Sequence, residues 1–194
     1  MPEWLEGRWS VSPAASALAQ GDLLVTAFTG SDAWRETAHG YVTDSAHTLL
    51  VPMPTESSVE VTLVADLTQQ FDQAGLMLRA SETEWIKAGV EYADGVFQLG
   101  AVVTHGTSDW SSNPVDWAGR LVTLSASRSG NAVVIRARVD EEEWRTIRVA
   151  WVDPALTYEA GPYLAAPTRA GLTVRFTRWA TGAADSEIHP DGLP

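Results

Sequence analysis

Three polar side chains recur at alternate positions along two neighbouring segments of the chain. Gln73 opens the segment 73–79, and Lys87 and Glu91 lie in the segment 85–91. Successive side chains of a β-strand point to opposite faces, so these three share one face while the apolar residues between them point into a core. Amide, ammonium and carboxylate groups are the partners that hydroxyl-rich ligands hydrogen-bond to. The pattern predicts a polar binding site on the outer face of a sheet.

Glycines interrupt both segments on this same face. An antiparallel pairing that sets Gly75 opposite Gly89 also sets Gln73 opposite Glu91, and it places Arg79 across from Trp85, where a cation–π contact is possible. A slip of one residue would turn charged side chains into the core, which their charge opposes. Facing glycines leave the backbone bare, so we predict a notch floored by peptide groups. In the alternative interpretation, the polar side chains form an exposed ion pair and the glycines relieve crowding.

Two polar segments with aromatic residues, 31–39 and 105–112, are predicted to be loops that form the walls of this notch. Their tryptophans could equally be lids over the edge of the core. The complete set of predicted ligand-binding residues is Trp34, Arg35, His39, Gln73, Arg79, Trp85, Lys87, Glu91, Asp109 and Trp110.

The sequence gives little support for metal binding, phosphate binding or catalysis. The four histidines lack the spacing of metal ligands, and no phosphate-binding glycine loop or nucleophile motif is present, so we expect no metal and no cofactor. Glycoside hydrolysis needs two carboxylates about 5–10 Å apart across one cleft. Glu91 could be one of them, but no second acid stands beside it in a same-face pattern. A second carboxylate facing Glu91 would strongly favour an enzyme.

Composition narrows the class of protein. The 194 residues carry a net charge of −12 with scattered Lys and Arg, which disfavours nucleic acid or an anionic membrane as a partner. There is no Cys for disulfides or thiolate chemistry. Neither a signal peptide nor an apolar run of membrane-spanning length is visible, so we expect a cytoplasmic protein.

The rest of the chain is typical of an all-β protein. Segments with a two-residue apolar period, bounded by turn residues, predict about ten or eleven strands in a two-sheet antiparallel jelly-roll sandwich. We expect one domain over residues 1–180 and a loosely held tail over 181–194. One short helix is possible at 13–19, and Pro162 is expected to mark a crossover because proline disrupts a central strand.

Several motifs together resemble one family. Residues 71–79 (FDQAGLMLR), 85–92 (WIKAGVEY), 108–111 (SDWS), 32–35 (DAWR) and 169–176 (RAGLTVRF) are similar, in their order, to the domain of unknown function 1349 family. The resemblance covers about residues 21–179 and implies a concanavalin A-like lectin/glucanase jelly roll. Some members are labelled regulation-of-enolase proteins, which implies an intracellular role. The family supplies no established catalytic residues, and likeness of fold to glucanases is analogy only.

Three functions follow as hypotheses. The first is a domain that binds carbohydrate or a small sugar-like polar ligand on the concave sheet face. The second is a protein-interaction or regulatory module of intracellular metabolism, for which an exposed aromatic patch would be the sign. The third is a glycan-acting enzyme that uses Glu91 as an acid or base. The sequence leans away from the enzyme.

Overall fold

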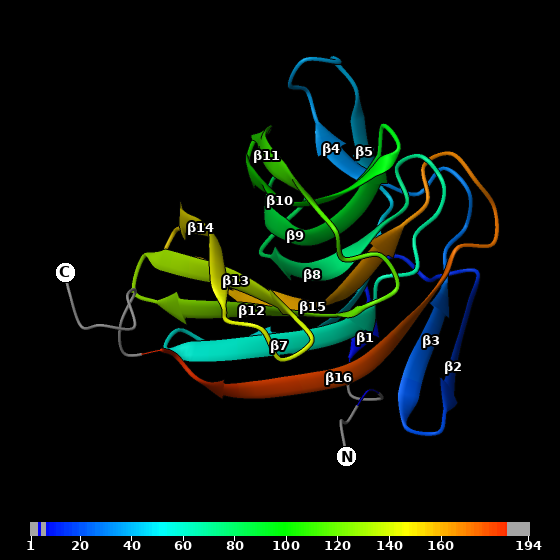
Figure 1. The fold of residues 1–194 in the computed structure, drawn as a ribbon. Helices are drawn as coiled ribbons and strands as arrows, with labels where there is room; N and C mark the ends of the chain where they lie inside the picture. Colours follow the sequence, from blue (N-terminus) through cyan, green and yellow to red (C-terminus); the bar gives the residue numbers. More distant parts are fainter. Residues whose placement is uncertain (1–3, 5–6, 186–194) are drawn as a thin grey trace.

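The computed structural model describes residues 4 and 7–185, and these residues form two large antiparallel sheets (Figure 1). The first sheet has the order β1(Arg8–Trp9), β6(His47–Met53), β15(Tyr158–Ala165), β8(Gln73–Arg79), β9(Glu84–Ala93), β10(Val96–His105), β11(Thr107–Val115). The second has the order β14(Arg145–Trp151), β13(Ala132–Val139), β12(Leu121–Ser129), β7(Ser57–Val64), β16(Thr173–Ala183), β3(Asp22–Thr26), β2(Ala15–Ala19). A small hairpin of β4(Ala33–Arg35) and β5(Val42–Asp44) stands apart from both.

The inner faces of the two sheets enclose one apolar core. The alternation in β8 and β9 is as the sequence predicts: Leu76 and Leu78 of β8, and Ile86 and Val90 of β9, pack into the core. Side chains from the second sheet, Phe176 among them, meet them there. The all-β sandwich is therefore confirmed, with more strands than expected. Within the described residues there is no helix, and so none that could cross a membrane.

The predicted register at the centre of the first sheet is confirmed. Gly75 pairs with Gly89, and Gln73 pairs with Glu91. Gly100 of β10 extends the row, because it pairs with Gly89 on the other side. A Cβ atom on Gly75 would lie 2.1 Å from the carbonyl oxygen of Ala88, so this row has no room for side chains.

Three local predictions were wrong. Ala15–Ala19 is an exposed strand and not a helix, because Gln20 and Gly21, both with positive φ, close a tight hairpin onto β3. Pro162 lies inside β15 and not at a crossover. Pairing between β15 and β6 is interrupted at residues 161–162, so the missing N–H of the proline breaks no hydrogen bond there.

The segment 105–112 is also not a loop, since most of it forms the edge strand β11. The proline in that strand, Pro114, is tolerated because an edge strand has one unpaired side. At the other end of the chain, β16 pairs with β7 as far as Ala183, so the first residues of the predicted tail are part of the sheet. Residues 186–194 lie outside the described part of the chain.

The glycine row yields a prediction about stability. Gly89→Ala should destabilise the fold by about 2–4 kcal/mol, because the new methyl group would lie 2.2 Å from the carbonyl oxygen of Ala74. Gly182→Ala in β16 is the matched control, since its nearest neighbour is the flexible Ser58 hydroxyl at 3.2 Å. Urea unfolding of both variants measures the difference. Equal destabilisation would show that the close approach at Gly89 is not what requires glycine.

Candidate functional site

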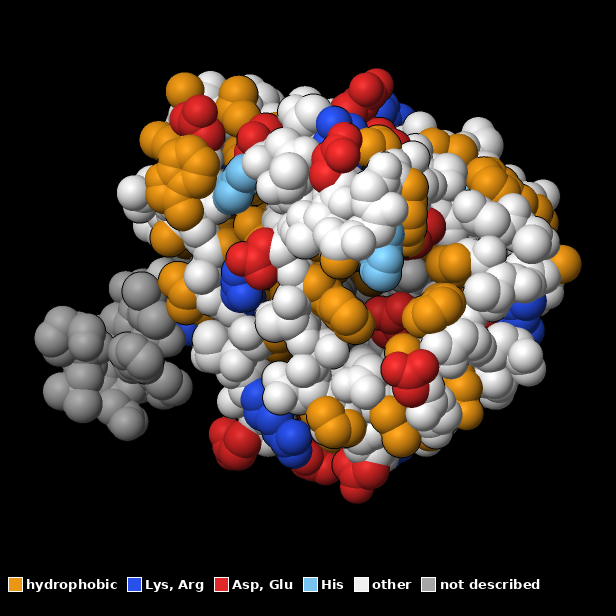
Figure 2. All heavy atoms as spheres, turned by 90° about the horizontal axis from the view of Figure 1, so that it is seen from above, with side chains coloured by type: hydrophobic (Ala, Val, Ile, Leu, Met, Phe, Trp, Pro, Cys, Tyr) orange, Lys and Arg blue, Asp and Glu red, His pale blue; other side chains and the backbone are white. Residues whose placement is uncertain are grey.

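A cavity of about 320 Å³ opens on the outer face of the first sheet, beneath the β4–β5 hairpin. Figure 1 shows the hairpin standing over β9 and β10 on the side away from the second sheet. The residues that line the cavity are Asp32, Trp34, His39, Tyr41, Phe71, Gln73, Lys87, Glu91, Val102, Trp110, Pro167 and Thr168. Seen from above, hydrophobic and acidic side chains lie close together around a histidine on this face (Figure 2).

The polar floor of the cavity is a buried network. The Lys87 ammonium donates to Gln73 Oε1 at 2.7 Å and to Asp32 Oδ1 at 3.2 Å, and the Gln73 amide donates to the same Asp32 oxygen at 3.2 Å. Lys87 is 7% exposed and Gln73 is 4% exposed. A buried ammonium group is tolerated only when paired, so Asp32 is the counter-ion that allows Lys87 to point into this face.

Asp32 also shapes the segment that covers the sheet. Its carbonyl oxygen accepts from the N–H groups of Ser45 and Ala46, and its Oδ1 accepts from the N–H of Ala33. These bonds close the base of the β4–β5 hairpin. The same residue therefore folds the hairpin and anchors it to β9 through Lys87.

Glu91 differs from its neighbours in the floor. Across the described residues, its half-buried carboxyl group has no hydrogen-bond or ion-pair partner. Burial raises the pKa of Glu91 to about 7; Lys87 opposes this rise, and the negative charges of Asp32 and Asp94 add to it. Glu91 is thus a carboxyl group that changes charge near neutral pH while it faces the cavity.

A narrower trough continues from the cavity along the glycine row. Gly89, Gly100 and Tyr163 line it together with Gln98 and Ser112. Tyr163 is 3% exposed, and within the described residues its hydroxyl group has no hydrogen-bond partner. Burial, followed by the charges of Glu91 and Asp32, raises the pKa of Tyr163 well above its usual value, so the hydroxyl stays protonated and can donate a hydrogen bond.

Aromatic side chains form the walls. Trp34 is fixed by its indole N–H, which donates to the Thr37 carbonyl at 3.0 Å, and its ring packs 6.0 Å from that of His39. His39 in turn stacks on Tyr41, with ring centroids 5.8 Å apart. Trp110, which lies on β11, is 50% exposed. The β4–β5 hairpin and β11 therefore both contribute aromatic side chains to the lining of the cavity.

A third wall comes from two connected loops. Phe71 lies in the turn before β8, with a positive φ of 66°. The next residue, Asp72, is fully buried, accepts from the N–H groups of Thr68 and Gln69, and pairs with Arg169 at 2.8 Å. This ion pair holds together the loops that contribute Phe71, Pro167 and Thr168.

The structure brings together six of the ten residues that the sequence selected: Trp34, His39, Gln73, Lys87, Glu91 and Trp110. Trp85 does share their face, but it is 1% exposed because the hairpin and Trp34 cover it. Arg79 does not stack on Trp85. It forms a two-pronged ion pair with Asp44 at 2.6 and 2.5 Å and so ties the hairpin down.

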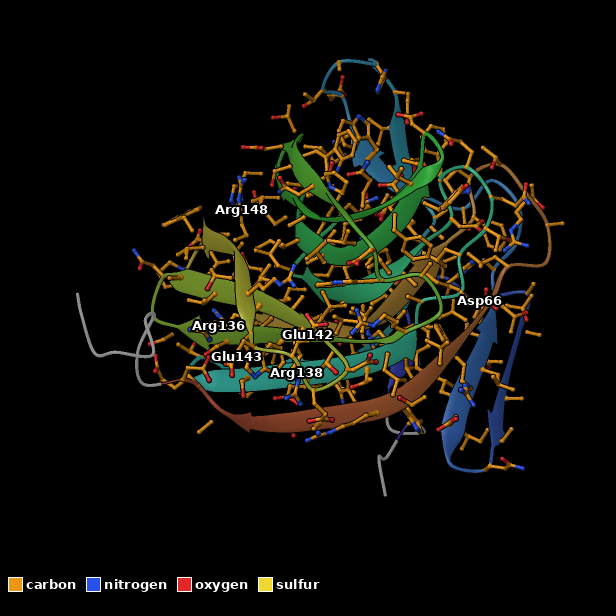
Figure 3. All side chains as sticks on the ribbon, viewed as in Figure 1. Asp66, Arg136, Arg138, Glu142, Glu143 and Arg148 are labelled. Atoms are coloured by element: carbon orange, nitrogen blue, oxygen red, sulfur yellow. The ribbon has the colours of Figure 1, made fainter. Side chains whose placement is uncertain are left out.

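The other two selected residues also lie outside the cavity lining. Arg35 donates from Nε to the Gly106 carbonyl at 3.0 Å. Asp109 pairs with Arg148 at 3.2 Å, and Figure 3 shows Arg148 reaching from β14 towards β11. Both residues connect elements of the scaffold.

Sequence reasoning missed Asp32, Tyr41 and Phe71. Asp32 and Phe71 do stand within the segments that carry the family resemblance, but nothing in a single sequence shows that they fold over β9. Asp32 is the second carboxylate that the sequence lacked next to Glu91, since both line one cavity. Over the described residues, no group of three or more His, Cys, Asp or Glu side chains could hold a metal ion.

Two seven-stranded antiparallel sheets that enclose one core form a jelly-roll-like β-sandwich. A ligand-sized cavity lies on one outer face of this sandwich. A solved sandwich with the same fold is part of a xylan β-1,4-xylosidase from Bacillus halodurans, with a TM-score of 0.69 and 15% identity over 93% of this chain. This chain spans only 38% of that enzyme, so the likeness concerns the fold alone.

The chain belongs to the protein family of unknown function DUF1349, whose model matches residues 9–184. It is 31% identical to Regulation of enolase protein 1 of Saccharomyces cerevisiae over 93% of this chain and 91% of that protein. The crystal structure of a functionally unknown protein from Saccharomyces cerevisiae superposes with a TM-score of 0.89 and 30% identity, covering 94% of this chain and 99% of that one.

The raised pKa of Glu91 predicts how stability depends on pH. The folded state keeps the proton on Glu91 up to about pH 7, whereas the unfolded chain loses it near 4.5, so stability should fall as the pH rises between these values. Glu91→Gln removes this contribution and should raise the free energy of unfolding at pH 8 by about 1–3 kcal/mol relative to the wild type. Urea unfolding at pH 5 and pH 8 measures the slope, and an unchanged slope in the variant would contradict the assignment.

Proposed function

We propose that this domain binds a sugar or a sugar-like polar ligand in the cavity between the β4–β5 hairpin and the first sheet. One observation carries the proposal: the polar side chains of Gln73, Lys87 and Glu91 line the same cavity as the partly buried ring of Trp34 and the half-exposed ring of Trp110. Sugars present hydroxyl groups at their edges and apolar C–H groups on their faces. A polar floor with ring-lined walls matches both features.

The size and the unused hydrogen-bonding groups support this proposal. A volume of about 320 Å³ lies at the lower end of the range of roughly 300–1,000 Å³ for small-molecule pockets. The Glu91 carboxyl and the Tyr163 hydroxyl have no partner among the described side chains, so a ligand can supply partners at no loss to the fold.

Trp110→Ala tests the proposal with little risk to the fold. Trp110 is half exposed, so its loss should change stability by less than about 1 kcal/mol, yet it should weaken ligand binding about tenfold or more because a stacking wall is lost. Trp151→Ala is the matched control, because Trp151 is 54% exposed on β14 and does not line the cavity. The assay is titration calorimetry with xylo-, cello- and malto-oligosaccharides.

Binding that both variants weaken equally would contradict the assignment of the cavity. If the wild type binds none of the oligosaccharides, the proposal fails in this form. The protein-interaction hypothesis then has the stronger case, since Trp151 and Val149 on β14 are 54% and 49% exposed.

A glycan-cleaving enzyme is the second candidate, favoured by the pair of carboxyl groups. Glu91 is protonated up to about pH 7 and could act as general acid, while Asp32, ion-paired with Lys87, supplies the carboxylate. With nitrophenyl glycosides as substrates, Asp32→Asn and Glu91→Gln should each abolish nitrophenol release. A Glu91→Gln variant that still cleaves at the wild-type rate would exclude this mechanism.

A further inference from the structure

The cavity has more negative than positive groups within reach of a ligand. Asp32 and Glu91 both line it, whereas Lys87 is the only Lys or Arg among the described residues that line it. The Lys87 charge is already matched, because its ammonium group contacts Asp32 Oδ1 at 3.2 Å and Gln73 Oε1 at 2.7 Å. Glu91 is left as the acid that has no ion-pair partner within the described residues.

Nearby arginines cannot serve as that counter-ion. Arg79 is held by both carboxylate oxygens of Asp44, and the Arg35 guanidinium donates to the carbonyl of Gly106. Neither lines the cavity. The described part of the chain therefore offers Glu91 no cation at hydrogen-bond distance.

The walls of the cavity also favour a cation. Trp34, Tyr41, Phe71 and Trp110 present aromatic rings to the same space as Glu91. Ring faces carry negative electrostatic potential, and aromatic cages with a nearby acid are the usual way in which proteins bind organic ammonium groups. The chain's net charge of −12 attracts cations to the molecule before they reach the site.

We propose that the cavity recognises a small hydroxylated organic cation, in which an ammonium group lies between the aromatic walls and pairs with Glu91. This inference deepens the proposed function and rests on it, because it takes the sugar-like ligand to be an amino sugar. The hydroxyl groups of such a ligand would meet Tyr163 and the glycine-row trough, and its cationic group would contact Glu91.

The charged and titratable groups that face Glu91 define its pH response. They are Lys87, Asp32, Asp94, Tyr41 and Tyr163, together with His39 on the hairpin side of the cavity. An ammonium ligand favours the ionised form of Glu91, so binding of a permanently charged ligand should strengthen as the pH rises from 6 to 8. The same change should be absent when residue 91 cannot ionise.

Two pairs of probes test the proposal by titration calorimetry. Choline and its neutral carbon isostere 3,3-dimethylbutan-1-ol, measured at pH 8, differ only in charge. Glucosamine and glucose, measured at pH 7, test the sugar form. In the wild type, choline should bind about tenfold or more tightly than its isostere. Glu91→Gln should remove this preference and its pH dependence.

Asp109→Asn is the matched control, because it removes one negative charge close to Trp110 but outside the cavity, and it should keep the preference. Thermal unfolding confirms that both variants are folded. Equal binding of the charged and neutral probes, or a preference that survives Glu91→Gln, overturns the inference. If the inference fails in this way but neutral sugars bind, the proposed function still stands. Binding of choline but of no sugar supports ammonium recognition and overturns the sugar proposal, and binding of none of the probes overturns both.

Discussion

The buried ammonium group of Lys87 is the constraint on which the outer face of the first sheet depends. An isolated charge in such a position is strongly unfavourable, so the chain must bring a counter-ion to it. Asp32 does so from a segment more than fifty residues earlier, and Gln73 completes the network from the neighbouring strand. This requirement holds the β4–β5 hairpin over β9 and creates the roof of the cavity. The Arg79–Asp44 ion pair secures the same hairpin at a second point.

The same network explains why Glu91 is chemically distinct. Because Lys87 pairs with Asp32, Glu91 is left without an ion-pair partner among the described residues, and burial raises its pKa more than the nearby Lys87 charge lowers it. A buried carboxyl group without an ion-pair partner lowers the stability of the fold when it ionises. A ligand that supplies the missing cation would stabilise its charged form. Perturbed carboxyl groups in a cavity mark functional sites for this reason.

The glycine row has a different role, which is to set the shape of the site. Gly75, Gly89 and Gly100 lie side by side where the backbones of three strands leave no space for a Cβ atom. Side chains on this row would fill the trough that leads away from Glu91. The three glycines therefore place no side chain on the outer face of the sheet, and backbone groups and Tyr163 line the trough instead.

The sequence by itself determined the features that depend on alternation along β8 and β9. Lys87 and Glu91 share one face of β9, while Ile86 and Val90 share the other, and a slip of one residue would bury the charges. The pairing of Gly75 with Gly89 and of Gln73 with Glu91 could therefore be predicted. The same alternation gave the sandwich and the polar floor. These are local consequences of a two-residue period.

Only the tertiary structure decided which side chains from distant segments meet this floor. Trp85 has the same parity as Lys87, yet it is buried because the hairpin covers it, and Asp32 reaches the floor because the hairpin folds over β9. Most of segment 105–112 forms a strand because it pairs with β10, although its local composition is that of a loop. Contacts between segments far apart in the chain arise from the balance of burial and charge pairing over the whole molecule, and no spacing along the sequence encodes them.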